Sequence, residues 1–144
     1  MPVTATDPKT ALVVIDLQKS HVRRETISPG AQILANAVRL VDAFRAKNLP
    51  VVLVRVGWTS PDRADAVRVR TEAPPPGPLP SDFFEYRRRR IANIVLCGIS
   101  TSIGVESTAR DAYERGYNLT FASDAMTDVD ADAYGRALEI IFPR

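Results

Sequence analysis

The sequence predicts a single α/β domain over residues 1–144, a three-layer α/β/α sandwich built around a parallel sheet. Short apolar runs rich in β-branched residues, typical of strands buried on both faces, alternate along the chain with amphipathic segments of helical spacing. The 144 residues, 45% apolar and 25% charged, suffice for one core and exclude an intrinsically disordered chain.

The first half of the chain predicts a strand, a helix and a second strand. Residues 11–15 (ALVVI) form an apolar run that ends at Asp16, and apolar residues then recur with helical spacing from Ile33 to about Lys47. Residues 51–54 (VVLV) predict a second buried strand. This order implies a right-handed crossover between neighbouring parallel strands.

The second half repeats the alternation after an interruption. Residues 59–82 are predicted to be a loop, because their many prolines lack the amide donors that a helix or a central strand needs. The elements expected beyond it are a strand at 91–96, a helix at 101–115 closed by Gly116, a strand at 118–122 and a helix at 130–141.

Composition excludes several classes of function. A formal net charge of +2 is too small for a generic nucleic-acid binder, and the basic run at 87–90 is more typical of a solvated surface. We find neither an apolar run long enough to cross a membrane nor an export signal, so we expect a cytoplasmic protein without membrane or nucleic-acid partners. A single cysteine excludes an intrachain disulfide and a cysteine-cluster zinc site, and we expect no metal or cofactor.

Ligands of such sheets bind beyond the carboxyl ends of the strands. Three predicted strand ends carry polar residues: 16–18, 98–102 and 123–125. Asp16 directly follows a buried strand and is our candidate general acid or base. The alternative is that Asp16 only caps a loop or pairs with an arginine. Asp124 is a weaker candidate of the same kind.

The residues from Gly98 to Gly104 join a strand to a helix, where free backbone amides could bind an anion or an oxyanion. The alternative is a plain turn in which Ser100, Thr101 or Ser102 caps the helix. Cys97 is expected to be a small buried core residue rather than a nucleophile, because it lies within an apolar strand.

Gln18 and His21 lie in the loop after the first strand, close to Asp16. His21 is equally compatible with ligand contact and with a plain surface loop. One histidine beside one carboxylate would make at most a weak metal site.

Three segments resemble the isochorismatase-like hydrolases, a superfamily of cysteine hydrolases that also contains nicotinamidases and N-carbamoylsarcosine amidases. They are ALVVIDLQ at 11–18, IVLCGISTSIGVESTARDAYERGY at 94–117 and ASDAMTD at 122–128. The resemblance implies a Rossmann-like parallel sheet of six strands, a small-molecule substrate, and homodimers or larger homo-oligomers.

The amidases of that superfamily use an aspartate, a lysine and a cysteine. Asp16 matches the aspartate, but the cysteine position falls on Gly104, so a thioester mechanism is not expected. A glycine there resembles the isochorismatase branch, in which Asp16 would protonate a vinyl ether and water would add. The resemblance also implies a cis peptide bond between Ile99 and Ser100.

We assign a substrate or oxyanion cradle to seven residues of the turn and its surroundings besides Asp16. These are Ile99, Ser100, Thr101, Ile103 and Gly104 in the turn, joined by Gln18 and His21 from the first loop. Arg23, Arg24 and Arg55 are candidates for binding substrate carboxylates.

The family's lysine has no counterpart. Lysine occurs only at Lys9, Lys19 and Lys47, none on a central strand, and 81–86 is too short for the strand and helix that should carry it. We predict that a segment of the family's domain is missing near residues 81–90, either lost by the protein or omitted from the sequence as printed.

The function predicted is hydrolysis of a small metabolite without a cysteine nucleophile. The alternative is a catalytically silent binding or assembly protein. A nucleotide-binding domain is disfavoured by the missing glycine fingerprint.

Overall fold

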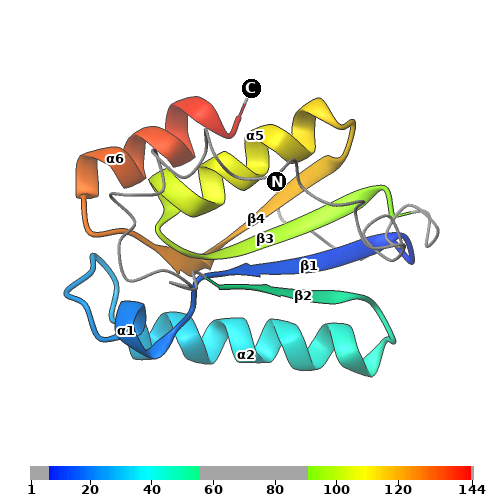
Figure 1. The fold of residues 1–144 in the computed structure, drawn as a ribbon, viewed down its shortest axis with the longest axis horizontal. Helices are drawn as coiled ribbons and strands as arrows, with labels where there is room; N and C mark the ends of the chain where they lie inside the picture. Colours follow the sequence, from blue (N-terminus) through cyan, green and yellow to red (C-terminus); the bar gives the residue numbers. More distant parts are fainter. Residues whose placement is uncertain (1–6, 56–90, 144) are drawn as a thin grey trace, which may run out of the picture. The chain divides into compact units, whose positions relative to one another are not determined.

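The computed structural model describes residues 7–55 and 91–143, and four strands in this part of the chain form one parallel sheet. The order across the sheet is β2-β1-β3-β4 (Figure 1). The strands are β1 (Thr10–Ile15), β2 (Val51–Val54), β3 (Asn93–Ile99) and β4 (Asn118–Thr127). The predicted strand, helix, strand unit at the start of the chain is confirmed, since β1 pairs in parallel with both β2 and β3.

Helices cover both faces of the sheet, which confirms the three-layer α/β/α sandwich (Figure 1). On one face lie the short α1 (Lys19–Val22) and the long α2 (Gly30–Ala46). On the other face, η2 (Thr101–Val105) leads into α5 (Glu106–Glu114), and α6 (Ala131–Arg136) leads into η3 (Ala137–Ile141). The two segments predicted as single helices thus each contain a π-helical stretch. Gly116 follows α5 at φ +84°, as predicted for a left-handed helix end.

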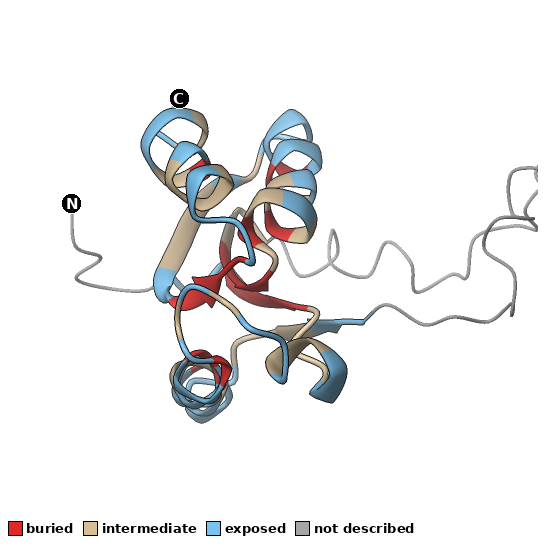
Figure 2. Ribbon diagram, turned by 90° about the vertical axis from the view of Figure 1, so that its left-hand side faces the viewer, coloured by how far each residue is buried: buried red, intermediate tan, exposed pale blue. Residues whose placement is uncertain are grey.

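The core lies between the two helical layers, along the central strands (Figure 2). β1 is buried along its whole length because it has a strand on either side and helices above and below. The largest side chains without exposed surface include Leu12, Ile15, Leu96 and Met126. Their burial explains why the sequence of the central strands is apolar without alternation.

The prediction that residues 51–54 are buried is wrong at the carboxyl end of β2. Leu53 is 64% exposed and Val54 is 39% exposed. The reason is that β2 is an edge strand of the described sheet, with β1 on one side only. An apolar run predicts a strand, but it does not show whether a second strand pairs with the other side of that strand.

The fourth strand is longer than predicted, and its end lies elsewhere. β4 pairs with β3 at Leu96–Phe121 and again at Gly98–Met126, with a register shift between the two pairs. The stretch 122–125 therefore bulges within β4, and Ser123, Asp124 and Ala125 are not a strand end, contrary to our expectation. The strand ends at Thr127, so that the next residue, Asp128, lies at the carboxyl edge.

None of the helices in the described ranges is both long and apolar enough to span a bilayer. The predicted loop at 59–82 and the predicted missing segment near 81–90 lie outside the described residues.

Candidate active site at the carboxyl edge of the sheet

Asp16 lies at the carboxyl end of β1 in a backbone conformation that is unusual for a residue other than glycine, with φ 49°. Its amide donates a hydrogen bond of 3.0 Å to the carbonyl of Val54, which ties the end of β1 to the end of β2. Its Oδ1 is buried, and no side chain or amide of the described residues donates to it. An unsatisfied buried carboxylate oxygen is costly, and such atoms are concentrated at functional sites.

The ends of β1 and β3 approach so closely that only glycine fits at position 98. A Cβ on Gly98 would lie 2.0 Å from the carbonyl oxygen of Ile15, and the residue has φ +129°. The following peptide bond, between Ile99 and Ser100, is cis, as the resemblance implies. The chain thus leaves β3 directly beside Asp16 and turns into η2.

Gly104 faces Asp16. A Cβ built on Gly104 would lie 3.6 Å from Asp16 Oδ2 and 3.8 Å from the carbonyl oxygen of Ile99. It would also lie 2.9 Å from Cγ2 of Ile15, closer than real Cβ contacts. The structure therefore brings together the two positions on which the predicted chemistry depends, and the methyl group of Ile15 crowds the place where a side chain of residue 104 would begin.

Hydrogen bonds within the turn decide which of its amides are already engaged. The amides of Ile103 and Val105 both donate to the carbonyl of Ser100, at 3.2 Å. The amide of Ile103 is therefore not free for an oxyanion, and its side chain is 65% exposed. The side chain of Ser100 does not cap this helix start, which was one of the alternatives we considered. The hydroxyl of the buried Thr101 donates instead to the carbonyl of Thr127 at 3.1 Å.

Asp128 is a residue of this edge that our sequence analysis did not single out. It is completely buried, and its Oδ2 accepts a hydrogen bond of 2.7 Å from the amide of Ser102. A signal was available in the sequence, because two apolar residues and Thr127 precede Asp128 much as an apolar run precedes Asp16. The polar residues of the bulge concealed it, since they broke the apolar pattern of β4.

Gln18 and His21 are linked to Asp16 through the backbone. The amide of Gln18 donates to the carbonyl of Asp16 at 2.7 Å, and the carbonyl of Gln18 accepts from the amide of His21 at 2.9 Å. His21 is half-buried on α1, with Nδ1 3.4 Å from the hydroxyl of Ser20. Among the described residues, no three histidine, cysteine, aspartate or glutamate side chains form a group that could hold a metal ion.

Cys97 is a buried core residue, as predicted. It has no exposed surface, and burial, together with the negative charge of Asp124, raises the pKa of its thiol to about 12. The thiol therefore stays protonated near neutral pH, which makes it a poor nucleophile.

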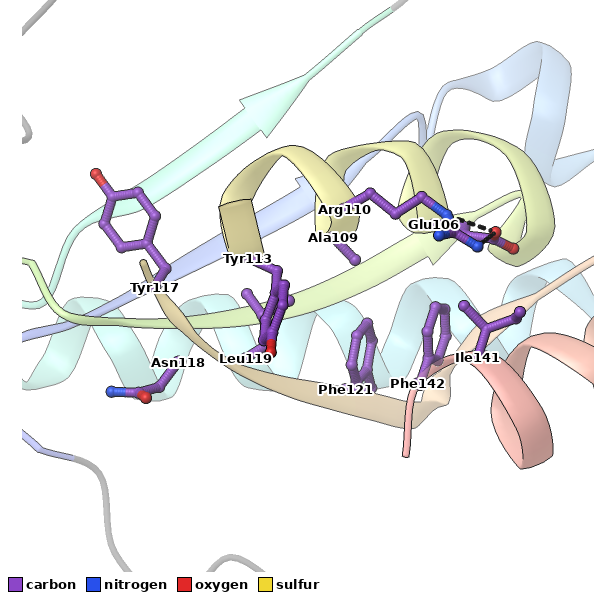
Figure 3. Close-up of a pocket in the computed structure, with 10 residues that line it drawn as sticks. All are labelled: Glu106, Ala109, Arg110, Tyr113, Tyr117, Asn118, Leu119, Phe121, Ile141 and Phe142. Carbon is purple, nitrogen blue, oxygen red and sulfur yellow. Dashed lines mark hydrogen bonds and ion pairs between the residues drawn. The ribbon is translucent and has the colours of Figure 1, made fainter. Parts of the chain in front are cut away.

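A cavity of about 500 Å³ that Asp16 does not line lies between α5, β4 and η3 (Figure 3). The rings of Phe121 and Phe142 stack in its wall with centroids 3.8 Å apart, and an ion pair of 2.7 Å joins Glu106 to Arg110. None of the predicted site residues lines it. We assign the candidate site to the carboxyl edge, where the unsatisfied carboxylate and the turn meet, rather than to this cavity.

The lysines lie apart from the central strands, as the sequence suggested. Lys9 precedes β1 and so lies at the opposite end of this strand from Asp16, and Lys47 follows α2. Lys19 is exposed on α1. None of them therefore occupies a central strand.

Comparison with known proteins places the chain in a family. The sequence matches the Isochorismatase domain over residues 10–86 and 84–144. It is 39% identical over 173 residues to the isochorismatase family protein YecD of Escherichia coli O157:H7, covering 94% of this chain and 88% of YecD. That alignment is longer than this chain, so YecD carries residues that the chain lacks.

A solved structure and a more distant relative agree. An isochorismatase family protein from Burkholderia thailandensis superposes with a TM-score of 0.79 at 38% identity, over 96% of this chain and 89% of that one. The ureidoacrylate amidohydrolase RutB of Stutzerimonas stutzeri is 25% identical over 178 residues, covering 86% of this chain and 72% of RutB. With a domain match along most of its length and a relative of this similarity, the chain belongs to the isochorismatase family.

Proposed function

We propose that this protein is a hydrolase of a small metabolite in which Asp16 acts as the acid and base and no cysteine takes part. The observation that carries the proposal is the placement of Gly104, whose Cβ would lie 3.6 Å from Asp16 Oδ2. A carboxylate and the position of a covalent nucleophile face each other, and the nucleophile position holds only hydrogen. Proton transfer is the chemistry that remains to this pair.

Hydrolysis of a vinyl ether fits such a site. Asp16 would give its proton to the vinyl carbon, which leaves an oxocarbenium-like centre at the neighbouring carbon. Water adds to this centre and returns a proton to Asp16, and the resulting hemiketal breaks into a carbonyl compound and an alcohol. The reaction requires a proton donor and water, but no covalent intermediate on the protein.

Amide hydrolysis through a thioester fits less well. RutB is an amidohydrolase by name. In this chain the only thiol is Cys97, which is completely buried and has a pKa raised to about 12 by burial and by Asp124. The missing thiol at position 104 therefore favours direct attack by water over acyl transfer.

A second candidate function is a catalytically silent protein that binds a small molecule or assembles with further copies of itself. It is favoured by the lack of a charge partner for Asp16 among the described residues. In the described part of the chain, no lysine of a central strand provides a positive charge beside it. Exposed apolar side chains, such as Leu53 and Val38, offer surface that a homo-oligomer would cover.

Turnover tests the proposal and separates these candidates. The purified protein is incubated with isochorismate as the vinyl ether, and with nicotinamide and ureidoacrylate as amides, and the products are measured by chromatography. We expect hydrolysis of the vinyl ether and a fall in kcat of about 100-fold or more in Asp16→Asn, the usual contribution of a general acid or base. Asp130→Asn is the control, since Asp130 is exposed at the start of α6.

Two outcomes would contradict the proposal. Unchanged turnover in Asp16→Asn would remove Asp16 from the reaction. Absence of turnover by the unmodified protein on all three compounds would favour the silent binding protein, and analytical ultracentrifugation would then show whether it assembles.

A further inference from the structure

Asp128 is a fully buried charged residue at the carboxyl edge, and neither the sequence analysis nor the proposed reaction gives it a role. Burying a carboxylate is costly unless its oxygens accept hydrogen bonds. Here both do: Oδ2 accepts from the amide of Ser102 at 2.7 Å, and Oδ1 accepts from the amide of Val129 at 2.8 Å. The charge is thus satisfied by backbone amides, one of them in η2.

A second contact joins the same two segments. The hydroxyl of Thr101, also fully buried, donates to the carbonyl of Thr127 at 3.1 Å. Two consecutive residues at the end of β4 therefore hold two consecutive residues at the start of η2. A carboxylate beside the first turn of a helix is also favoured by the partial positive charge of the helix start.

The same end of β4 holds the loop before α2. The amide of Ile27 donates to the carbonyl of Asp128 at 3.0 Å, and the amide of Ser28 donates to the hydroxyl oxygen of Thr127 at 3.1 Å. The loop that follows β1 and the turn that follows β3 are therefore both bound to one dipeptide. Their separation at this edge is set by β4.

This arrangement bears on Asp16 because Gly104 lies only two residues beyond Ser102. Asp16 Oδ1 receives no hydrogen bond from the described residues and so does nothing to hold the turn. The distance of 3.6 Å between a Cβ at position 104 and Asp16 Oδ2 is therefore not held by a hydrogen bond to Oδ1. The hydrogen bonds of Asp128 and Thr127 to η2 hold the turn instead.

We propose that Asp128 is a positioning residue of the candidate active site. By holding the amide of Ser102, its carboxylate directs position 104 and the start of η2 toward Asp16. The purpose assigned to Asp128 rests on the proposed function, but the geometry can be tested without any turnover.

A reporter thiol tests the geometry on the whole chain. Gly104→Cys places a thiol at the position that faces Asp16, and its alkylation by iodoacetamide is followed from pH 6 to pH 9 by mass spectrometry. Cys97 does not compete, because it is buried and its pKa is raised to about 12 by burial and by Asp124. The alkylation rate depends on the thiolate fraction, which the carboxylate of Asp16 beside position 104 lowers.

We expect Asp128→Asn, added to Gly104→Cys, to speed alkylation at pH 7.5 about fivefold or more and to move the pH midpoint downward, because position 104 is no longer held beside the carboxylate of Asp16. The asparagine amide offers one acceptor oxygen to two amides, so the start of η2 loses its anchor. General loosening of the fold would also speed alkylation at position 104, but it would expose the buried Cys97 to alkylation as well.

Asp130→Asn is the matched control. The Oδ1 of Asp130 also accepts two backbone amides, from Asp132 at 2.9 Å and Ala133 at 3.0 Å, but it does so at the start of α6 and in an exposed position. We expect it to leave both the rate and the pH midpoint of the thiol at position 104 unchanged.

A second measurement avoids the reporter, because a Cβ at position 104 would lie 2.9 Å from Cγ2 of Ile15 and could disturb the turn. Amide exchange measured by NMR on Asp128→Asn alone should be about tenfold or more faster at Ser102, with the amides of β1 unchanged. The proposal is overturned by an unchanged pH profile of the reporter together with unchanged exchange at Ser102. Neither readout involves a substrate, so failure to hydrolyse any compound would overturn the proposed function alone.

Discussion

Two aspartates stand at strand ends of the same sheet edge, and the structure treats them in opposite ways. Asp128 is completely buried, and each of its carboxylate oxygens accepts a backbone amide. Asp16 is half-buried, and its buried Oδ1 has no donor in the described part of the chain. A carboxylate that satisfies backbone amides stabilises the fold, whereas one that is buried and left without a donor costs stability and is available to a ligand.

The two aspartates show how a carboxylate that stabilises the fold can be distinguished from one that is available for catalysis. Both aspartates follow apolar strand residues, so strand-end position alone cannot distinguish them. The count of donors at each oxygen can. Removing each carboxylate should therefore have opposite consequences for the free energy of unfolding.

The largest effect is expected for Asp128→Ala. It removes two charge-assisted hydrogen bonds and leaves the amides of Ser102 and Val129 without their acceptor, which should lower the free energy of unfolding by about 3 kcal/mol. Urea denaturation followed by circular dichroism measures it. Asp130→Ala removes a helix cap instead and should cost about 1 kcal/mol. Equal losses in the two variants would contradict the role given to Asp128.

The next largest effect is expected in the pH dependence of the free energy of unfolding, and it comes from the thiol of Cys97. Burial, assisted by the charge of Asp124, raises the pKa of Cys97 from 9.0 to about 12. Above pH 9 the unfolded chain loses the thiol proton while the folded protein keeps it, so stability should fall by about 1.4 kcal/mol per pH unit toward pH 12. Cys97→Ala should lack this component of the slope. Parallel curves for the two proteins would show that the thiol is not shielded.

A smaller loss is expected for Thr101→Val. The variant deletes the buried hydrogen bond to the carbonyl of Thr127 while keeping the shape of the side chain, at a cost of about 1 kcal/mol. Thr108→Val is the matched comparison, because the hydroxyl of Thr108 in α5 donates to the carbonyl of Gly104, four residues earlier in the adjoining η2. We expect thermal denaturation to show a clearly smaller change for Thr108→Val.

The smallest effect on stability is expected for Asp16→Asn. Since no described group donates to Oδ1, the substitution removes a buried charge without breaking a hydrogen bond there. The free energy of unfolding should stay the same or rise by up to about 1 kcal/mol, the pattern of residues kept for function at the expense of stability. A loss comparable to that of Asp128→Ala would remove the contrast between the two aspartates.

The elements that lead to Asp16 were predictable because their pattern is local. An apolar run without alternation forecast β1, and helical spacing after Pro29 forecast α2. The close approach of Gly104 to Asp16 was not a consequence of periodicity. It followed from the resemblance of the turn, and the distances now give it a geometric basis.

The errors came from non-local packing. The exposure of Leu53 depends on whether β2 has a second neighbour, which no pattern within 51–54 reports. Asp128 was missed because β4 continues through a polar bulge, which looks like the end of a strand in the sequence. Its role depends on the amide of Ser102, in a segment far away in the sequence, and backbone donors leave no trace in the residue types.

The bulge of β4 has a consequence for the tolerance of this edge to change. Between the pairs Leu96–Phe121 and Gly98–Met126, β3 advances two residues while β4 advances five. Those surplus residues determine how far the strand extends before Thr127 and Asp128. Substitutions among 122–125 should consequently be tolerated better than a deletion there, since a shorter segment has to span the same distance between Phe121 and Met126 or give up the pairs Gly98–Met126 and Ile99–Thr127 that place Asp128.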